Sequence, residues 1–180
     1  PQASVAGGAD IVMFSGDKLL GGPQGGLIVG RKTALDRLKR HPLARAVRMD
    51  KASIAGLAAT LRIHLQGDAK LRIPVWRMIA TPLDALAARA SAIAAAVGPS
   101  ASLIDGRSMI GGGSLPGESL PARLVALTPS RGGNATALAA RLRAHGVIAR
   151  VEDACVLLDP RTIDPEDDDR VAQACVKSLG

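Results

Sequence analysis

Residues 8–30 read GADIVMFSGDKLLGGPQGGLIVG, and this stretch decides how the chain begins to fold. The uninterrupted apolar run Ile11–Phe14 is typical of a strand that is buried on both faces in a parallel sheet. A second apolar run, residues 27–29, is flanked by glycines and predicts another strand. The glycines crowded into the loop 15–24 between them indicate tight backbone turns. The stretch therefore predicts an α/β fold with a glycine-rich loop at the end of a buried strand.

The next residues predict helices. Residues 33–40 read as a short helix that ends before Pro42, because the residue before a proline is pushed out of the helical region. Asp50 is a good N-cap for a longer helix, and Gly67 supplies its stop. Apolar residues fall on one stripe of this helix, which predicts that the stripe faces a core. The stripe consists of Ile54, Leu57, Ala58, Leu61 and Leu65.

A second domain is predicted after an irregular patch at residues 73–76. Thr81 is expected to cap a long Ala-rich helix, with Pro82 at its first position and Gly98 just beyond its end. Shorter elements follow and predict a small α+β domain. They are a strand at 101–110, a loop at 111–121, a strand at 123–128, a helix at 134–145, a hairpin through 152–153 and a last helix capped by Asp164 with Pro165. The predicted domains are residues 1–75 and 76–180, with the boundary near 72–82.

Composition narrows the class of protein. Apolar residues make up 47% of the 180 residues and charged residues 22%, which is typical of a folded soluble protein. One Trp, one Phe and no Tyr argue against recognition by aromatic stacking. Cys155 and Cys175 form no CxxC pair, so neither a disulfide scaffold nor a zinc site is indicated, and a cytoplasmic location is expected. No apolar run is long enough to predict a membrane span. Because the chain opens with Pro1, we expect an upstream portion to be missing.

The net charge of +7 is unevenly distributed. Residues 31–51 hold eight Lys or Arg against two Asp, while residues 152–169 hold eight acids against one Arg. The basic stretch produces a positive field suited to anions or RNA phosphates. A solvated basic surface fits the same pattern, so charge alone leaves both interpretations open.

Lys18 is the candidate for covalent chemistry. It lies in the glycine-rich turn at the carboxyl end of the first strand, where α/β folds place ligand sites. Partial desolvation there lowers the pKa of a lysine and frees its amine to form a Schiff base. Most loop lysines are exposed and idle, however, and the glycines match neither the P-loop nor the dinucleotide fingerprint. From spacing alone the site is a weak prediction.

The sequence motifs are more specific than the spacing of individual residue types. Residues 8–30, and above all SGDKLLGGPQ at 15–24, closely resemble the cofactor-lysine segment of the bacterial selenocysteine synthase family, the L-seryl-tRNA(Sec) selenium transferases. The resemblance continues in HPLARAVRMDK at 41–51, LAATLR at 57–62 and GGGSLP at 111–116. Matching motifs extend to about residue 121. The order of predicted elements is compatible with the family to the end of the chain.

The resemblance implies a fold-type-I pyridoxal-phosphate (PLP) enzyme, similar to aspartate aminotransferase. The chain looks like its carboxyl-terminal two fifths, namely the end of the PLP-binding large domain and the small domain. The implied reaction converts seryl-tRNA(Sec) to selenocysteyl-tRNA(Sec) with selenophosphate, through an aminoacrylyl intermediate. The implied partners are these two substrates and, for assembly, further copies of the chain or the missing amino-terminal half; no membrane is expected.

The resemblance also implies roles for particular residues. Lys18 would form the Schiff base with PLP and act as the base. Asp17 would orient the amine, although capping the turn explains it equally well. Gly21 and Gly22 would shape the loop near the cofactor phosphate. Arg45 and Arg48 would bind the anionic selenium donor, converging on it if one helical turn carries both.

Several alternatives remain open at the level of sequence. A PLP lyase that acts on a small amino acid without tRNA shares these motifs, as does a non-catalytic remnant or assembly module. A basic RNA-binding module fits the charge pattern alone. His41 and His64 are expected to be non-catalytic, His64 because it lies in a helix without a partner in view, and Trp76 is expected to fill a seam between domains.

Overall fold

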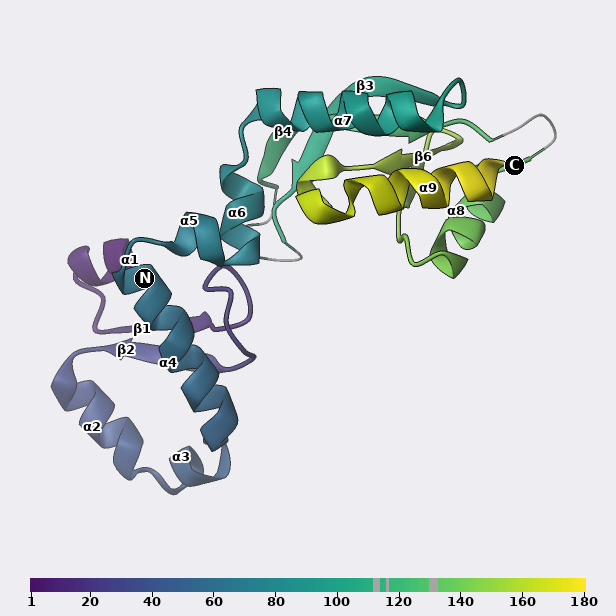
Figure 1. The fold of residues 1–180 in the computed structure, drawn as a ribbon. Coiled ribbons are helices and arrows are strands. Elements are labelled where there is room, and N and C mark those ends of the chain that lie inside the picture. Colours follow the sequence, from purple (N-terminus) through teal and green to yellow (C-terminus); the bar gives the residue numbers. More distant parts are fainter. Residues whose placement is uncertain (112–113, 116, 130–132) are drawn as a thin grey trace. The chain divides into compact units, whose positions relative to one another are not determined.

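The computed structural model describes residues 1–111, 114–115, 117–129 and 133–180. The chain divides into two compact units, residues 1–77 and residues 78–180 (Figure 1). Gly112, Gly113 and Pro116 of the GGGSLP motif lie outside the described residues. The predicted assignment of the first unit to a PLP-binding large domain stays a prediction.

The first unit combines one β-hairpin with short helices. Its elements, in chain order, are α1 (Gln2–Ala6), β1 (Ile11–Ser15), β2 (Gly26–Gly30), α2 (Lys32–Arg40), α3 (Pro42–Ala46), α4 (Lys51–Leu65) and α5 (Ala69–Arg72). The boundary between the units falls within the next helix, α6 (Pro74–Ala80). The helix α6 begins inside the patch that sequence reasoning left irregular, with Pro74 at its first position, where a missing N–H costs no helical hydrogen bond.

The first strand is not the buried parallel strand that its apolar run predicts. β1 pairs antiparallel with β2, from Ile11 opposite Gly30 to Ser15 opposite Gly26. Its residues alternate between exposed and half-buried, and Met13 is 74% exposed. The ten residues between the strands are too few for the crossover that a parallel neighbour requires, so the chain folds straight back. Continuous hydrophobicity showed that this is a strand but not how it pairs.

The helix α4 begins and ends as its sequence predicts. The Asp50 carboxylate accepts hydrogen bonds from the backbone N–H of Ser53 at 2.9 Å and from its hydroxyl at 2.6 Å. Beyond the helix, Gly67 adopts φ +81° and its N–H donates to the carbonyl of His64. These contacts confirm both the predicted cap and the predicted stop.

The buried face of α4 differs from the predicted one. In the apolar stripe, Ile54, Leu61 and Leu65 are exposed, and Leu65 is 86% exposed. The predicted burial of the apolar stripe is therefore wrong. The face of α4 that packs within the chain carries small and polar residues instead. Thr60 is the buried residue of the helix, and a Cβ added to Gly56 would lie 3.2 Å from the ring of Pro23. This face is buried because the loop that contains Pro23 approaches the helix closely at Gly56.

The second unit is an antiparallel sheet with helices. Its elements are α7 (Leu83–Val97), β3 (Ala101–Met109), β4 (Ser119–Leu127), α8 (Ala135–Ala144), β5 (Arg150–Glu152), β6 (Cys155–Leu158), the 3₁₀ turns η1 (Pro160–Thr162) and η2 (Pro165–Asp167), and α9 (Asp168–Leu179). The strand order is β3-β4-β6-β5, with every neighbouring pair antiparallel. The hairpin predicted through residues 152–153 is confirmed, with positive φ at Asp153 and Ala154.

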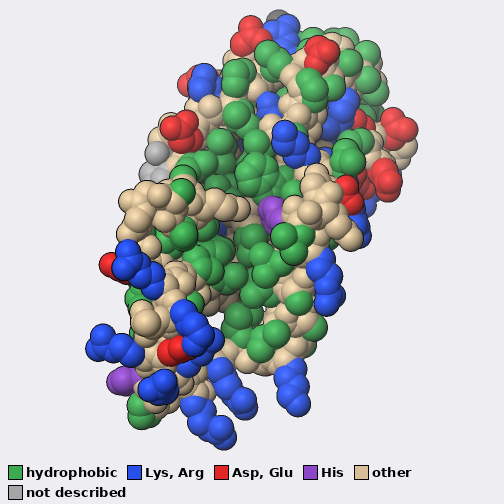
Figure 2. Space-filling view, turned by 90° about the vertical axis from the view of Figure 1, so that its left-hand side faces the viewer, with side chains coloured by type: hydrophobic (Ala, Val, Ile, Leu, Met, Phe, Trp, Pro, Cys, Tyr) green, Lys and Arg blue, Asp and Glu red, His purple; other side chains and the backbone are tan. Residues whose placement is uncertain are grey.

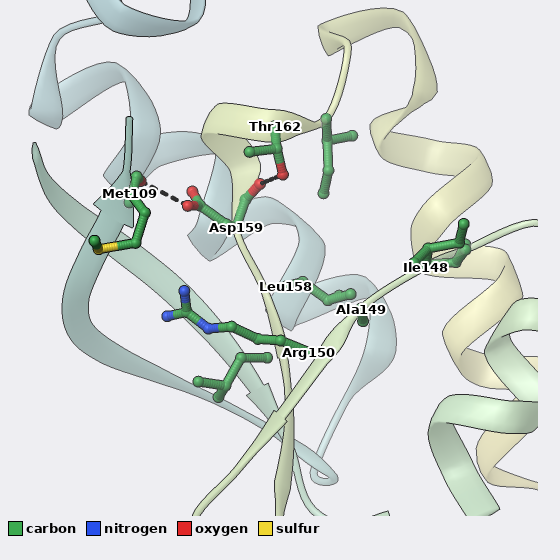
Figure 3. Close-up of a pocket in the computed structure, with 11 residues that line it drawn as sticks. Met109, Ile148, Ala149, Arg150, Leu158, Asp159 and Thr162 are labelled. Atoms are coloured by element: carbon green, nitrogen blue, oxygen red, sulfur yellow. Dashed lines mark hydrogen bonds between the residues drawn. The ribbon is translucent and has the colours of Figure 1, made fainter. Parts of the chain in front are cut away.

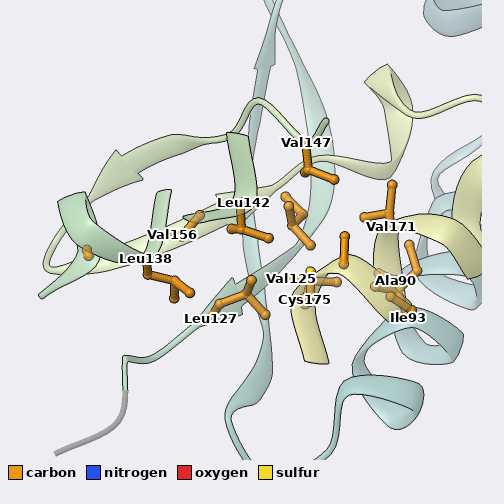
Figure 4. Packing of buried hydrophobic residues seen from close by; sticks show 14 residues of the cluster. Ala90, Ile93, Val125, Leu127, Leu138, Leu142, Val147, Val156, Val171 and Cys175 are labelled. Carbon is orange, nitrogen blue, oxygen red and sulfur yellow. The ribbon is translucent and has the colours of Figure 1, made fainter. Parts of the chain in front are cut away.

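Helices α7, α8 and α9 share one hydrophobic core with β4 and β6 (Figure 4). The core is aliphatic, as the scarcity of aromatic residues predicts. Its fully buried members include Ile93 of α7, Leu127 of β4, Leu142 of α8 and Cys175 of α9. Cys175 is therefore a core residue, whereas Cys155 is only half-buried.

Three boundaries in this unit correct the sequence prediction. The helix α7 begins at Leu83, so Pro82 occupies the N-cap rather than the first helical position. The strand β4 begins at Ser119 rather than residue 123 because its pairing with β3 continues to Met109 opposite Ser119. Asp164 precedes a 3₁₀ turn, and the last helix begins only at Asp168.

Helix length sets the limit on membrane insertion. Within the described ranges, no single helix is long and apolar enough to cross a membrane. The α6 and α7 helices pass that test only as a bent pair, by length and composition.

Candidate functional site

The loop of residues 16–25, which joins β1 to β2, folds back on itself. Gly16 N–H donates to the carbonyl of Gly25 at 2.8 Å, next to the last pair of the hairpin. Gly22 N–H donates to the carbonyl of Gly16, also at 2.8 Å. These two bonds tie both ends of the loop to one point at the mouth of the hairpin.

A tight turn over residues 18–21 places Lys18 at the start of this loop. The N–H of Gly21 donates to the carbonyl of Lys18 at 2.9 Å and closes the turn. Gly21 adopts φ +77°, and a Cβ added there would collide with the side chain of Ile73. A Cβ added to Gly22 would lie 3.0 Å from the hydroxyl oxygen of Thr60. Both glycines therefore allow the loop to lie directly against its helical support.

The same bonds limit what the glycines offer to a ligand. The amides of Gly21 and Gly22 both donate to carbonyls inside the loop. An N–H that is engaged in this way is not available to a phosphate. Within the described residues, the two glycines thus contribute the shape of the loop rather than free amide donors.

The side chains of Lys18 and Asp17 both point into solvent. The structure places them three and two residues after the end of β1, and both are exposed. Among the described residues, the Lys18 amine has no hydrogen-bond or ion-pair partner. The burial of Lys18 that the sequence suggested is not found, because the residue is exposed in this chain. The amine is accessible to an incoming aldehyde.

Two aromatic side chains hold the residues that follow Lys18, and sequence reasoning missed both. Nε2 of His64 lies 2.9 Å from the carbonyl oxygen of Leu20, and Nε1–H of Trp76 donates to the carbonyl of Leu19 at 2.6 Å. The expectation that His64 has no partner is therefore wrong. A faint signal was present, because His64 follows Thr60 by four residues and lies on the same face of α4.

The two predicted anion-binding arginines follow the basic helix α2. Arg45 lies in α3, which ends at Ala46, and Arg48 lies beyond that end. One helical turn therefore does not carry both, and the condition for their convergence through a helix is not met. Both side chains are exposed, and neither has an ion-pair partner within the described part of the chain.

The basic stretch as a whole forms a positively charged end of the first unit. Figure 2 shows Lys and Arg side chains gathered around α2 and α3. Two of its cations are paired, Arg31 with Asp10 at 2.8 Å and Lys32 with Asp36 at 2.5 Å. The remaining cations project from exposed positions, an arrangement that suits a polyanionic ligand.

The second unit contains a pocket of about 270 Å³ beside β6 and η1 (Figure 3). Its polar groups are already bonded to one another. The hydroxyl of Ser108 donates to Asp159 at 2.6 Å, and the hydroxyl of Thr162 donates to the carbonyl of Asp159 at 3.0 Å. Arg150 contacts Glu152 at 3.3 Å. Because these polar groups already bond to protein atoms, we interpret the pocket as a structural feature rather than a ligand site.

Arg161 in η1 contacts Ser108 beside this pocket and is 7% exposed. Burial lowers the pKa of its guanidinium, and the nearby Asp159 carboxylate opposes that effect. Its nitrogens donate to the hydroxyl of Ser108 at 3.1 Å and to backbone carbonyls. The closest carbonyls are those of Met78, Thr81 and Pro121. The residue holds η1 against β3, β4 and the start of the unit.

No cluster of metal-ligating side chains occurs within the described residues. The candidate groups for chemistry lie in the first unit, on an exposed lysine in a hydrogen-bonded loop and on the separate basic stretch of residues 31–51. A family model described as "SelA: L-seryl-tRNA selenium transferase" matches residues 1–164. The chain belongs to the SelA family. That match includes the whole Lys18 loop and the basic stretch.

Individual relatives agree with the SelA assignment. The chain is 50% identical to the L-seryl-tRNA(Sec) selenium transferase of Desulfovibrio desulfuricans over 91% of its own length and 37% of that relative. It is 44% identical to the enzyme of the same name from Nitratidesulfovibrio vulgaris, over 99% of its length and 40% of the relative. A similar protein from Carboxydothermus hydrogenoformans is 36% identical. The chain spans about two fifths of the length of these SelA relatives.

Proposed function

We propose that this chain carries the cofactor-lysine segment and the small domain of a PLP-dependent enzyme that converts seryl-tRNA(Sec) to selenocysteyl-tRNA(Sec), with selenophosphate as the selenium donor. The single observation that carries the proposal is the accessible amine of Lys18 in a braced glycine-rich loop, in a chain of the SelA family. The fold-type-I architecture, a cytoplasmic location and assembly as a homo-oligomer remain predictions of the same hypothesis.

The residues present fit the covalent attachment of PLP. A primary amine without a competing partner can condense with an aldehyde, and Lys18 is exposed at a turn whose backbone is fixed. Asp17 is exposed beside it and is proposed to orient the amine. Gly21 and Gly22 let the loop lie directly against Ile73 and Thr60. When bound, PLP supplies an electron sink for a negative charge at the α-carbon of the substrate serine.

Lys18 is the proposed proton carrier of the reaction. With PLP and substrate bound, the neutral amine of Lys18 would take the proton from the α-carbon of the serine. The resulting ammonium would then donate that proton to the leaving hydroxyl, which departs as water. These two steps would require one nitrogen within a narrow range of positions, and the bonds of the loop fix the backbone from which the Lys18 side chain extends.

Arg45 and Arg48 are the proposed ligands of the selenium donor. Selenophosphate is a small oxyanion, and guanidinium groups bind such anions through paired N–H donors. Both arginines are exposed and unpaired within the described residues, so no internal ion pair must be broken when the donor binds. The surrounding basic stretch suits the phosphates of the tRNA substrate.

The exposed apolar surface of the first unit supports the proposal that further protein completes the site. All of residues 1–77 are described, and the buried side chains among them are those of Thr60 and Ile73. Many large apolar side chains of this unit remain exposed, although burial of such surface is what stabilises folded domains. They are Val5, Ile11, Met13, Ile28, Leu38, Leu43, Val47, Ile54, Leu61, Leu65 and Leu71. We therefore propose that the part of the SelA relatives not spanned by this chain covers this surface and completes the site.

The proposal is tested by reconstitution. The chain is produced fused to, or mixed with, the remaining part of a SelA protein, and PLP is added. The expected result is a visible Schiff-base absorbance band and conversion of seryl-tRNA(Sec) in the presence of selenophosphate. Lys18→Ala abolishes both, whereas Lys70→Ala, an exposed lysine in α5, leaves both unchanged.

The alternatives produce different results in the same assay. A PLP lyase produces the Schiff-base band and consumes a free amino acid but not seryl-tRNA. A non-catalytic remnant produces no band even when the rest of the protein is supplied. Either outcome contradicts the proposed function.

A further inference from the structure

We propose that His64 and Trp76 are positioning residues for Lys18, which act by anchoring two successive carbonyls of its turn. This inference deepens the proposed function, because it concerns the same lysine. It starts from the two side-chain contacts to the loop, 2.9 Å from His64 to Leu20 and 2.6 Å from Trp76 to Leu19.

The turn itself creates the need for these donors. Its closing bond uses the carbonyl of Lys18 and the N–H of Gly21 and leaves the carbonyls of the two central residues without a partner inside the turn. Leu19 and Leu20 are half-buried, so solvent has limited access to this part of the loop. A half-buried carbonyl without a donor costs free energy. His64 and Trp76 satisfy one such carbonyl each.

The two donors come from different helices that are braced against each other. His64 lies near the end of α4, and Trp76 lies in α6. Their rings meet edge to face, with centroids 6.4 Å apart and planes at 85°. Such a T-shaped pair is a favourable aromatic geometry and fixes the position of both rings. The donors therefore form one rigid support rather than two independent contacts.

The support fixes Lys18 from its carboxyl side, while the hairpin fixes it from its amino side. Gly16 and Gly22 tie the loop to the mouth of the hairpin, and the aromatic pair holds the residues directly after Lys18. Without the pair, a glycine-rich loop has many accessible conformations and the amine samples many positions. A base and Schiff-base partner must instead lie within a narrow range of positions.

Limited trypsin digestion of the 180-residue chain tests the support without any cofactor. Trypsin cleaves after Lys18, next to the carbonyl that Trp76 anchors. When cleavage follows the fraction of open loop, loss of one neutral hydrogen bond raises its rate about fivefold. Trp76→Phe and His64→Phe keep an aromatic ring but remove the donor, and each is expected to speed cleavage at Lys18 relative to cleavage after Arg143.

Two further variants separate anchoring from general damage. His64→Gln retains an amide donor and is expected to restore slow cleavage in part. His145→Phe replaces an exposed histidine at the end of α8 and is expected to change nothing. Unchanged cleavage after Lys18 in both donor-deleting variants, or equal acceleration in His145→Phe, overturns the proposal.

A second readout connects the support to the chemistry of the amine. In the reconstituted protein, the rate of borohydride-trapped PLP attachment at Lys18 is expected to fall about fivefold in Trp76→Phe. An unchanged rate beside faster cleavage shows that the pair holds the loop without positioning the amine, and overturns the inference. If even the unsubstituted protein attaches no PLP, the proposed function fails, while digestion still decides whether the pair anchors the loop.

Discussion

Replacement of Arg161 by methionine is expected to destabilise the second unit strongly. The methionine side chain fills much of the same space but donates no hydrogen bonds. The change leaves Asp159 without its buried cationic neighbour and deprives backbone carbonyls of their donor. The closest of these carbonyls are those of Met78, Pro121 and Thr81, which lie 2.8, 2.8 and 3.1 Å from the guanidinium nitrogens.

The expected magnitude follows from these contacts. Hydrogen bonds to a charged donor contribute about 1.5–3 kcal/mol each, so three of them set an upper range of about 5–9 kcal/mol. Burial disfavours the charged guanidinium and lowers its pKa, which offsets part of that sum. Removal of one partner from a buried charged network costs about 3–5 kcal/mol, and we expect Arg161→Met to fall in this range. Arg161→Lys recovers only part, because one ammonium cannot reach every carbonyl.

Urea unfolding followed by far-UV circular dichroism measures the effect. Trp76 lies in α6, and Arg161 donates to the Met78 carbonyl of the same helix, so Trp76 fluorescence gives a second readout of the same change. With an m-value of about 2 kcal/mol/M, the unfolding midpoint of the second unit falls by about 2 M in Arg161→Met. A loss below about 1 kcal/mol would refute the reasoning, because Arg161 would then be a surface-like contact despite its burial.

Three further predictions concern packing, pH and thiol chemistry. Leu142→Ala removes a fully buried side chain from the helical core and is expected to lower the free energy of unfolding by about 2–5 kcal/mol, measured by the same urea titration; a loss under 1 kcal/mol contradicts the assigned core. Hydrogen bonds from the hydroxyl and then the amide of Ser53 lower the pKa of Asp50 below its ordinary 3.8. The stabilisation of α4 by this cap is therefore complete above about pH 4 and is lost as the pH falls through the lowered folded-state pKa, and Asp50→Asn is expected to remove that pH dependence in fluorescence-detected unfolding. Desolvation raises the pKa of the buried Cys175 thiol to about 11, so iodoacetamide is expected to label the half-buried Cys155 first and Cys175 only after the second unit unfolds; equal labelling rates count against the burial.

Local rules predicted much of the fold. The Asp50 cap, the Gly98 stop and the hairpin through residues 152–153 depend on backbone preferences of a few neighbouring residues, and the structure contains all three. Gly98 adopts φ +87°, a conformation that side chains oppose. Such signals are readable because both the cause and the effect lie within one turn of chain.

Long-range pairing was less accessible from the sequence. The apolar run of β1 does not reveal that its neighbour is β2 and antiparallel, since that outcome depends on the length of the loop. The exposed stripe of α4 shows the same limit: apolar spacing marks a face that favours burial but does not say what covers it.

The candidate site was predicted only in part. The motif around Lys18 identified this lysine as the candidate cofactor lysine, because the motif is long and specific. The contacts of His64 and Trp76 were missed because they join residues that lie 44 and 57 positions apart, respectively. No sequence pattern around either residue indicates such a distant partner. The engaged amides of Gly21 and Gly22 likewise follow from the fold of the loop rather than from its composition.

Peptide mapping after borohydride reduction tests the central claim most directly. The reconstituted protein is incubated with PLP, reduced, digested with trypsin and analysed by mass spectrometry. Trypsin does not cleave after a modified lysine, so the account predicts one labelled peptide that contains an uncleaved Lys18 and ends at Arg31. A label on any other lysine, or no label on a folded protein, contradicts the account.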